Sequence, residues 1–249
     1  MPGKHIFTFF ILFILYPFTM AAQYSIVTDR PGQNDSPVSV PKGIFQVETG
    51  SLISIDPDQR NWILSGTLFK YGVVENLEIR ILPSLVHVRS RPLGEVNTLG
   101  IGDLQFGVKY HFLSSGKTDI GYLGHLIVPS GTREVSGGSF GMNHHIAVTH
   151  QFADWFSATA NTGFEYFAED TWNGLFALSF GFAITDRIGF FTEVYGSWPG
   201  FESADLYYDH GLTWVLSPNL QLDFSTGTGI TDKSNYYAVG VSWYAPFRN

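Results

Sequence analysis

The sequence predicts an all-β protein: a transmembrane, antiparallel, up-and-down β-barrel of about 12 strands. Three observations support this prediction. First, apolar and polar residues alternate in segments that recur along the whole chain, as they do in strands with two different faces. Second, the apolar positions carry large side chains, and aromatic residues make up 16% of the 249 residues. Third, short and longer connections alternate, as in barrels whose short turns face the periplasm and whose longer loops face the outside.

The segment 100–112 (GIGDLQFGVKYHF) shows the alternation most clearly. Successive strand side chains point to opposite faces, so this segment has one apolar and one polar face. Its two faces are Leu104, Phe106, Val108, Tyr110 and Phe112, and Asp103, Gln105, Gly107, Lys109 and His111. Because open sheets leave backbone groups unpaired in hydrocarbon, strands can cross a membrane only as a closed barrel.

Residues 1–22 are predicted to be a secretory signal peptide. Lys4 gives a positive start, residues 6–20 are apolar, and Ala21-Ala22 offers a cleavage site of small residues. The alternative is a transmembrane helix, which needs about 20 apolar residues, and this run is shorter. We therefore expect an exported protein whose mature chain begins at Gln23.

The composition excludes several classes of function. The chain has 14 basic and 22 acidic residues, a formal net charge of −8, which argues against nucleic acid as a partner. It has no cysteine, so it can form neither disulfides nor thiolate metal sites. No metal site or other cofactor is expected. The adjacent His144 and His145 would point to opposite faces of a strand, and Asp56-Pro57-Asp58 is too short for a calcium loop.

Residues 23–42 contain three prolines and little periodicity, which predicts an irregular N-terminal lead-in. This lead-in has two interpretations. It is either a periplasmic linker, which we favour, or a segment tucked into the barrel mouth.

Residues 43–249 are predicted to form the outer-membrane barrel. The second strand is the one whose two faces are hard to tell apart, and the last strand resembles the C-terminal signal that barrel-assembly machinery reads. The longest connections are expected at 87–99 and 129–142. The expected strands are 43–53, 62–71, 77–86, 100–112, 119–128, 143–152, 155–167, 174–184, 188–197, 205–216, 219–229 and 235–247.

Charged residues on the polar faces are predicted to lie inside the barrel, because Arg or Lys in lipid costs about 2–4 kcal/mol at the midplane. They either line a conduit with an acidic bias, favouring cations or neutral solutes, or form internal ion pairs and hydrogen bonds that fill the lumen. For any single residue we favour the second interpretation. The lumen-lining candidates are Glu48, Glu78, Arg80, Asp103, Lys109, Glu165, Glu193, Asp209 and Asp223.

Several short motifs occur in a fixed order over the first half of the mature chain. They are Thr28-Asp29-Arg30-Pro31, Val40-Pro41-Lys42-Gly43, Phe45-Gln46-Val47-Glu48, Lys70-Tyr71-Gly72, Leu77-Glu78-Ile79-Arg80, Gly100-Ile101-Gly102-Asp103, Lys109-Tyr110 and Pro129-Ser130-Gly131. On these motifs the chain resembles outer-membrane proteins of the phenol meta-degradation pathway family, which are labelled as transporters, and especially its Bacteroidetes-like members. The resemblance implies an outer-membrane barrel for the uptake of small hydrophobic compounds.

We therefore expect a monomeric channel or transporter in the cell outer membrane for small molecules, hydrophobic compounds among them, and not an enzyme. Its partners would be outer-membrane lipid, the solute and, during biogenesis, the barrel-assembly machinery. One alternative is a structural barrel without conduction. Another is a barrel lipid hydrolase, which would need Ser136 or Ser139 activated by His144, His145 or His150, and no spacing here matches a hydrolase motif. A third is a soluble ligand-binding barrel of the lipocalin sort with its apolar side chains inside.

Overall fold

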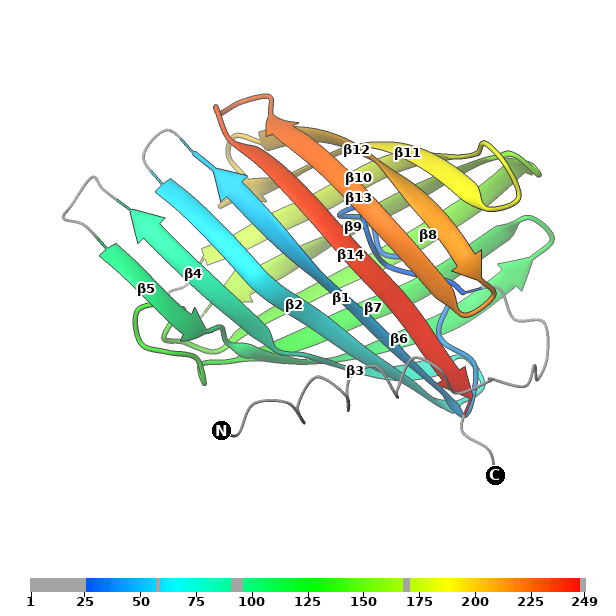
Figure 1. The fold of residues 1–249 in the computed structure, drawn as a ribbon, viewed down its shortest axis with the longest axis horizontal. Coiled ribbons are helices and arrows are strands. Elements are labelled where there is room, and N and C mark those ends of the chain that lie inside the picture. The colour runs from blue at the N-terminus through cyan, green and yellow to red at the C-terminus, as the bar shows by residue number, and fades with distance from the viewer. Residues whose placement is uncertain (1–25, 57–58, 91–95, 168–170, 247–249) are drawn as a thin grey trace, which may run out of the picture.

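The chain folds as a closed antiparallel β-barrel (Figure 1). The computed structural model describes residues 26–56, 59–90, 96–167 and 171–246, so the predicted signal peptide lies outside the described residues. None of the described residues forms a helix long and apolar enough to span a membrane. The strands are β1 (Ile44–Ile55), β2 (Gln59–Val74), β3 (Leu77–Leu82), β4 (Ser84–Ser90), β5 (Val96–Ile101), β6 (Leu104–Ser115), β7 (Thr118–Val128), β8 (Gly141–Ala153), β9 (Phe156–Phe167), β10 (Thr171–Ala183), β11 (Ile188–Pro199), β12 (Asp205–Ser217), β13 (Leu220–Gly229) and β14 (Asn235–Pro246).

These 14 segments make a wall of 12 strands, as the sequence predicts. The third wall strand consists of β3 and β4, which both pair with β2 and are separated by Pro83. Proline has no N–H to give to a ladder, so it interrupts the strand there. The fourth consists of β5 and β6, which are separated by Gly102 and Asp103. The barrel closes where β1 pairs with β14 from Ile44↔Pro246 to Ile55↔Asn235.

The two ends of the barrel differ in their connections. At one end, here called the short-turn end, the wall strands are joined by tight turns such as 75–76, 116–117, 154–155 and 218–219. The other end, the long-loop end, carries the loop 129–140. The long loop predicted over 87–99 is wrong, because β4 and β5 continue as a paired ladder from Leu85↔Ile101 to Ser90↔Val96. The alternation is weak there, since polar side chains stand on both faces.

The barrel is apolar outside and charged inside. Phe106, Phe180 and Val239 project outward and are 37–55% exposed, whereas Lys109 and Glu78 are fully buried. Large apolar side chains cover the outside of the wall, which suits contact with lipid rather than with water. This arrangement excludes the lipocalin-like alternative, in which the apolar side chains would fill the centre.

The N-terminal lead-in lies within the barrel (Figure 1, dark blue). It enters at the short-turn end, where the Ile26 N–H donates to the Pro218 carbonyl (3.1 Å). It returns to the same end at Gly43, whose N–H donates to the Gly72 carbonyl (2.8 Å). Of the two interpretations of the lead-in, the favoured periplasmic linker is therefore wrong. Residues 26–42 occupy the lumen and are called the plug below.

Candidate functional site

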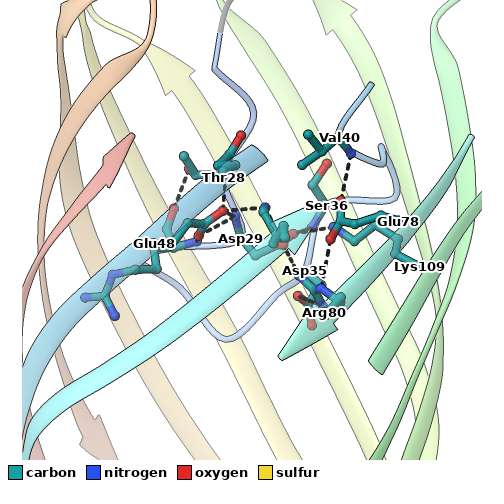
Figure 2. Close-up of polar contacts among 12 residues, drawn as sticks. Thr28, Asp29, Asp35, Ser36, Val40, Glu48, Glu78, Arg80 and Lys109 are labelled. Carbon is teal, nitrogen blue, oxygen red and sulfur yellow. Dashed lines mark hydrogen bonds and ion pairs between the residues drawn. The ribbon is translucent and has the colours of Figure 1, made fainter. Parts of the chain in front are cut away.

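Asp29, near the start of the plug, is the centre of a buried ionic cluster (Figure 2). Its Oδ1 accepts a hydrogen bond from Lys109 Nζ (2.6 Å) on β6. Its Oδ2 accepts from Lys70 Nζ (2.9 Å) on β2 and is also paired with the Arg80 guanidinium on β3. One carboxylate of the plug thus binds cations from three wall strands.

Two wall carboxylates complete this cluster and also hold the plug backbone. Glu48 on β1 accepts from the N–H groups of Asp29 and Arg30 (both 3.1 Å to Oε2) and is ion-paired with Lys70. Glu78 on β3 accepts from the Val40 N–H (2.7 Å) and pairs with Arg80 Nε (2.9 Å). Both side chains are fully buried.

The opposite wall holds the tip of the plug in the same way. Glu193 on β11 accepts from the N–H groups of Gln33 (2.7 Å) and Asn34 (3.0 Å). Asn161 on β9 accepts from the Asp35 N–H (2.9 Å) and donates to the Asp35 carbonyl (3.1 Å). The wall therefore contacts the plug from both sides of the lumen.

Three further contacts fix the side chains of the plug. The Arg30 guanidinium lies 3.1 Å from Asp223 Oδ1 on β13. The Asp35 carboxylate lies 3.0 Å from His145 Nε2 on β8 and 3.4 Å from Arg80 Nη1.

The chemistry of these contacts explains why the wall is rich in carboxylates. A buried backbone N–H needs an acceptor, and the plug pairs with the wall only through an isolated bridge between Lys42 and Gly72 among the described residues. Glutamate and asparagine side chains supply the missing acceptors. Hydrogen bonds to charged groups contribute about 1.5–3 kcal/mol each, and removing one partner of a buried ion pair costs about 3–5 kcal/mol.

The structure separates the nine lumen-lining candidates into groups. Glu48, Glu78, Arg80, Lys109, Glu193 and Asp223 all contact the plug. Asp209 is buried and accepts from the Tyr236 hydroxyl (2.5 Å), while its Oδ1 has no hydrogen-bond partner among the described residues.

The remaining two candidates, Asp103 and Glu165, act elsewhere. The Asp103 carboxylate accepts from the N–H groups of Gly131 (2.9 Å) and Gly137 (2.8 Å) and so anchors the loop 129–140. Glu165 accepts from Asn173 Nδ2 (3.0 Å) on the neighbouring strand β10.

Other members of the site were not predicted. Asp29 and Arg30 belong to the Thr28-Asp29-Arg30-Pro31 motif and Lys70 to Lys70-Tyr71-Gly72, so the motifs were the available signal. Lys70 was not among the predicted lumen-lining residues because the two faces of its strand are hard to tell apart. Asn161 shares a strand face with Glu165, so alternation predicts that it points inward, but no local pattern links it, His145 or Asp35 to the plug.

One cavity adjoins the tip of the plug, and a second lies at the long-loop end. The first, of about 280 Å³, is lined by Gln33, Asp35, His145 and Tyr195, among others. The other, of about 430 Å³, lies between the ends of β1, β11, β12, β13 and β14 at the long-loop end, and Tyr195 lines it as well. Open space therefore lies next to the plug and at the long-loop end.

The residues that a hydrolase would need are dispersed. His144 contacts the Tyr122 hydroxyl, His150 contacts Thr118 Oγ1 (2.8 Å) and His145 contacts Asp35. Among the described residues no serine hydroxyl makes a hydrogen bond with any of these histidines. The described part of the chain also contains no group of three or more His, Cys, Asp and Glu that could hold a metal ion.

Comparisons with known proteins agree with this architecture. A family model described as "Putative MetA-pathway of phenol degradation" matches residues 28–245. A search of curated proteins finds no match. An outer membrane channel from Pseudomonas putida F1 superposes with a TM-score of 0.72 at 11% identity, covering 87% of this chain and 99% of that one. The KdgM porin gives 0.59 at 10% identity (80% and 98%), and the NanC porin gives 0.58 at 8% identity (79% and 98%). These similarities establish a shared barrel fold.

Proposed function

Since this chain belongs to the family described as "Putative MetA-pathway of phenol degradation" and forms a barrel with an apolar exterior, we propose that it is an outer-membrane channel for small molecules, hydrophobic compounds among them. The similar folds of one outer membrane channel and two porins support this proposal.

The observation that carries the proposal is the way in which the lumen is filled. The interior of an eight-stranded barrel is just wide enough for its own side chains to fill. This wall has 12 strands, and the extra space is occupied by the plug, a segment that is not part of the wall. A wall of this size with its plug displaced would enclose a polar conduit.

The contacts of the plug suit reversible closure. Many of them are hydrogen bonds and ion pairs, and water can replace both kinds of partner. A solute would cross when the plug moves from the Asp29 cluster, while the wall strands keep their own ladders. The structure is then the closed state of the channel.

We further propose that the protein is not an enzyme and works as a monomer that the barrel-assembly machinery inserts into outer-membrane lipid. The dispersal of His144, His145 and His150 supports the first part. The apolar outer face supports the lipid environment.

Planar-bilayer conductance and solute-swelling assays on the refolded full chain test the proposal, with Asp29→Asn as the variant that releases the plug. Because the protein has no cysteine and Ser39 in the plug is buried, a thiol at position 39 (Ser39→Cys) reports plug release through its labelling rate. We expect low conductance for the wild type and higher conductance, with faster labelling, for Asp29→Asn. Asp186→Asn, in an exposed turn, is the matched control.

Labelling makes both outcomes informative. If position 39 becomes accessible in Asp29→Asn and still no ion or hydrophobic solute passes, the channel proposal is wrong and the barrel is structural.

A further inference from the structure

The two sides of the lumen differ in how their acidic residues are neutralised. On the side of β1, β2, β3 and β6, the carboxylates of Glu48 and Glu78 are paired with Lys70 and Arg80. On the side of β11 to β14, the acidic residues Asp56, Glu193, Asp209 and Asp232 take part in none of the ion pairs formed by the described residues. On this side Asp223 of β13 pairs with Arg30 of the plug, and those four carboxylates have no cation partner among the described residues.

The 430 Å³ cavity lies on this acidic side. The described residues that line it include two carboxylates, three tyrosines and several hydroxyl and amide groups, but no Lys, Arg or His. They are Ser54, Asp56, Tyr195, Tyr207, Gly227, Thr228, Asp232, Ser234, Asn235 and Tyr236.

Its aromatic wall is held in place by its neighbours. The rings of Tyr195 and Tyr207 are stacked with their centroids 5.3 Å apart and an interplanar angle of 18°. The Tyr207 hydroxyl donates to Asp232 Oδ2 (3.0 Å), and the Tyr236 hydroxyl donates to Asp209 (2.5 Å). Asp232 is also fixed by the Ser234 N–H (2.8 Å). The carboxylates and the rings form one built surface.

This surface favours one class of solute. Ring faces attract organic cations, and the attraction grows when the cation is removed from water. The charges of Asp56 and Asp232 add to it, whereas they would repel an anion. An apolar neutral solute would gain nothing from either carboxylate.

We propose that the cavity is a binding site for small organic cations such as quaternary ammonium compounds, at the outer entrance of the lumen. The inference deepens the proposed function, on which it rests, because it names a solute class that the channel would take up. Binding occurs on the outer side of the plug and can be measured without any flux.

Isothermal titration calorimetry on the detergent-solubilised full chain tests the site with choline. Its neutral isostere, 3,3-dimethylbutan-1-ol, has the same shape without the charge. We expect saturable choline binding that is at least about tenfold stronger than binding of the alcohol, a difference of about 1.4 kcal/mol.

Variants assign the binding to the cavity. In the double variant Asp56→Asn/Asp232→Asn, the amide oxygen at position 232 can still accept from the Ser234 N–H and the amide NH2 can donate to the Tyr207 hydroxyl oxygen, so the fold should persist while choline affinity falls at least tenfold. Tyr207→Leu, which removes one aromatic ring from the cavity, should also weaken choline binding. Glu202→Gln removes an exposed charge at the same end of the barrel, outside the cavity, and should bind choline like the wild type.

The failures of the two proposals can be told apart. Choline that does not bind, binds no better than the alcohol, or binds the double variant equally well would overturn the cation site and leave conductance untouched. Choline binding without any flux through the plug-released variant would instead keep the site and overturn the channel.

Discussion

A single carboxylate, that of Asp29, neutralises three buried cations that come from three different strands. Two of the three cations also pair with other carboxylates: Lys70 pairs with Glu48, and Arg80 pairs with Glu78 and Asp35. Lys109 has no second carboxylate among the described residues. The plug therefore supplies the carboxylate that neutralises Lys109, for which the described part of the wall provides no ion-pair partner.

This arrangement predicts an asymmetry between its partners. Asp29→Asn leaves three buried cations undercompensated and should destabilise the closed state by about 3–5 kcal/mol. Lys109→Met leaves Asp29 with two cations and should cost less, about 1.5–3 kcal/mol. Thiol labelling rates at the buried position 39 measure both. Equal rates for the two variants would contradict the central role of Asp29.

The pKa values of the two carboxylates of the cation site are shifted in opposite directions. Burial and the nearby charge of Asp232 raise the pKa of Asp56. Hydrogen bonds, first of all from the Ser234 hydroxyl, lower the pKa of Asp232, although its slight burial acts the other way. As the pH falls, Asp56 therefore takes up its proton first.

Choline affinity should accordingly decline in two steps on acidification, because the ionised carboxylates hold the cation. Affinity is full at neutral pH, and the first loss occurs above the usual aspartate pKa of 3.8. Calorimetry over a pH series measures the steps. Asp56→Asn should lack the first step and keep the second, and an unchanged profile in this variant would contradict the assignment.

The plug lies against the wall where glycines make room for its backbone. A Cβ added at Gly121 on β7 would clash with the Pro37 carbonyl oxygen, and one at Gly72 on β2 would clash with the Pro41 carbonyl oxygen. These positions allow an irregular segment to approach a strand closely, which any larger side chain would prevent.

Gly121→Ala should therefore loosen the plug without harming the wall. Overpacking of this kind costs about 1–3 kcal/mol, and here the plug backbone must give way. We expect faster labelling at position 39 and an unchanged thermal unfolding of the barrel. Gly66→Ala on β2, where the nearest atom is Ile63 Cγ2 at 3.4 Å, is the matched control and should label like the wild type.

The motifs that carry the family resemblance meet in space. Val40-Pro41-Lys42-Gly43 joins Lys70-Tyr71-Gly72 through the Gly43 to Gly72 hydrogen bond. Gly100-Ile101-Gly102-Asp103 joins Pro129-Ser130-Gly131 through Asp103 and Gly131. The motifs are thus the contacts that hold the plug and the long loop in place.

The barrel as a whole is a membrane protein because its exterior is apolar. Val239 on β14 is 55% exposed and pairs with Ser51 on β1 and Phe224 on β13 within the middle of the wall. Ile184 is 59% exposed and lies just after β10, at the short-turn end. The two side chains have similar exposed fractions but lie at different depths in the membrane.

Arginine at these two positions should have different effects. Val239→Arg should lower the free energy of unfolding in lipid vesicles by about 2–4 kcal/mol, and Ile184→Arg by about 0–1 kcal/mol, because the cost falls toward the interfaces. Denaturant titration of refolded protein in vesicles measures both. Equal costs would contradict the membrane orientation derived from the exposed side chains.

The fold could be predicted from the sequence because alternation is a local property. The faces of Leu104–Phe112 can be assigned from neighbouring residues alone, and so can the inward positions of Glu78, Arg80 and Lys109. The exceptions are local too. The ladder of β4 and β5 was not predicted because alternation is weak there. Lys70 was not predicted to face the lumen because the two faces of β2 are similar.

By itself, the sequence determined a barrel of about 12 strands with charged residues inside, since a period of two residues decides which side chains face lipid. Only the tertiary structure decided what those charges do. Asp29 and Lys109 are 80 residues apart, and Arg30 and Asp223 are 193 apart. Such contacts depend on where closure of the barrel places each strand around the plug, and no local pattern encodes that position.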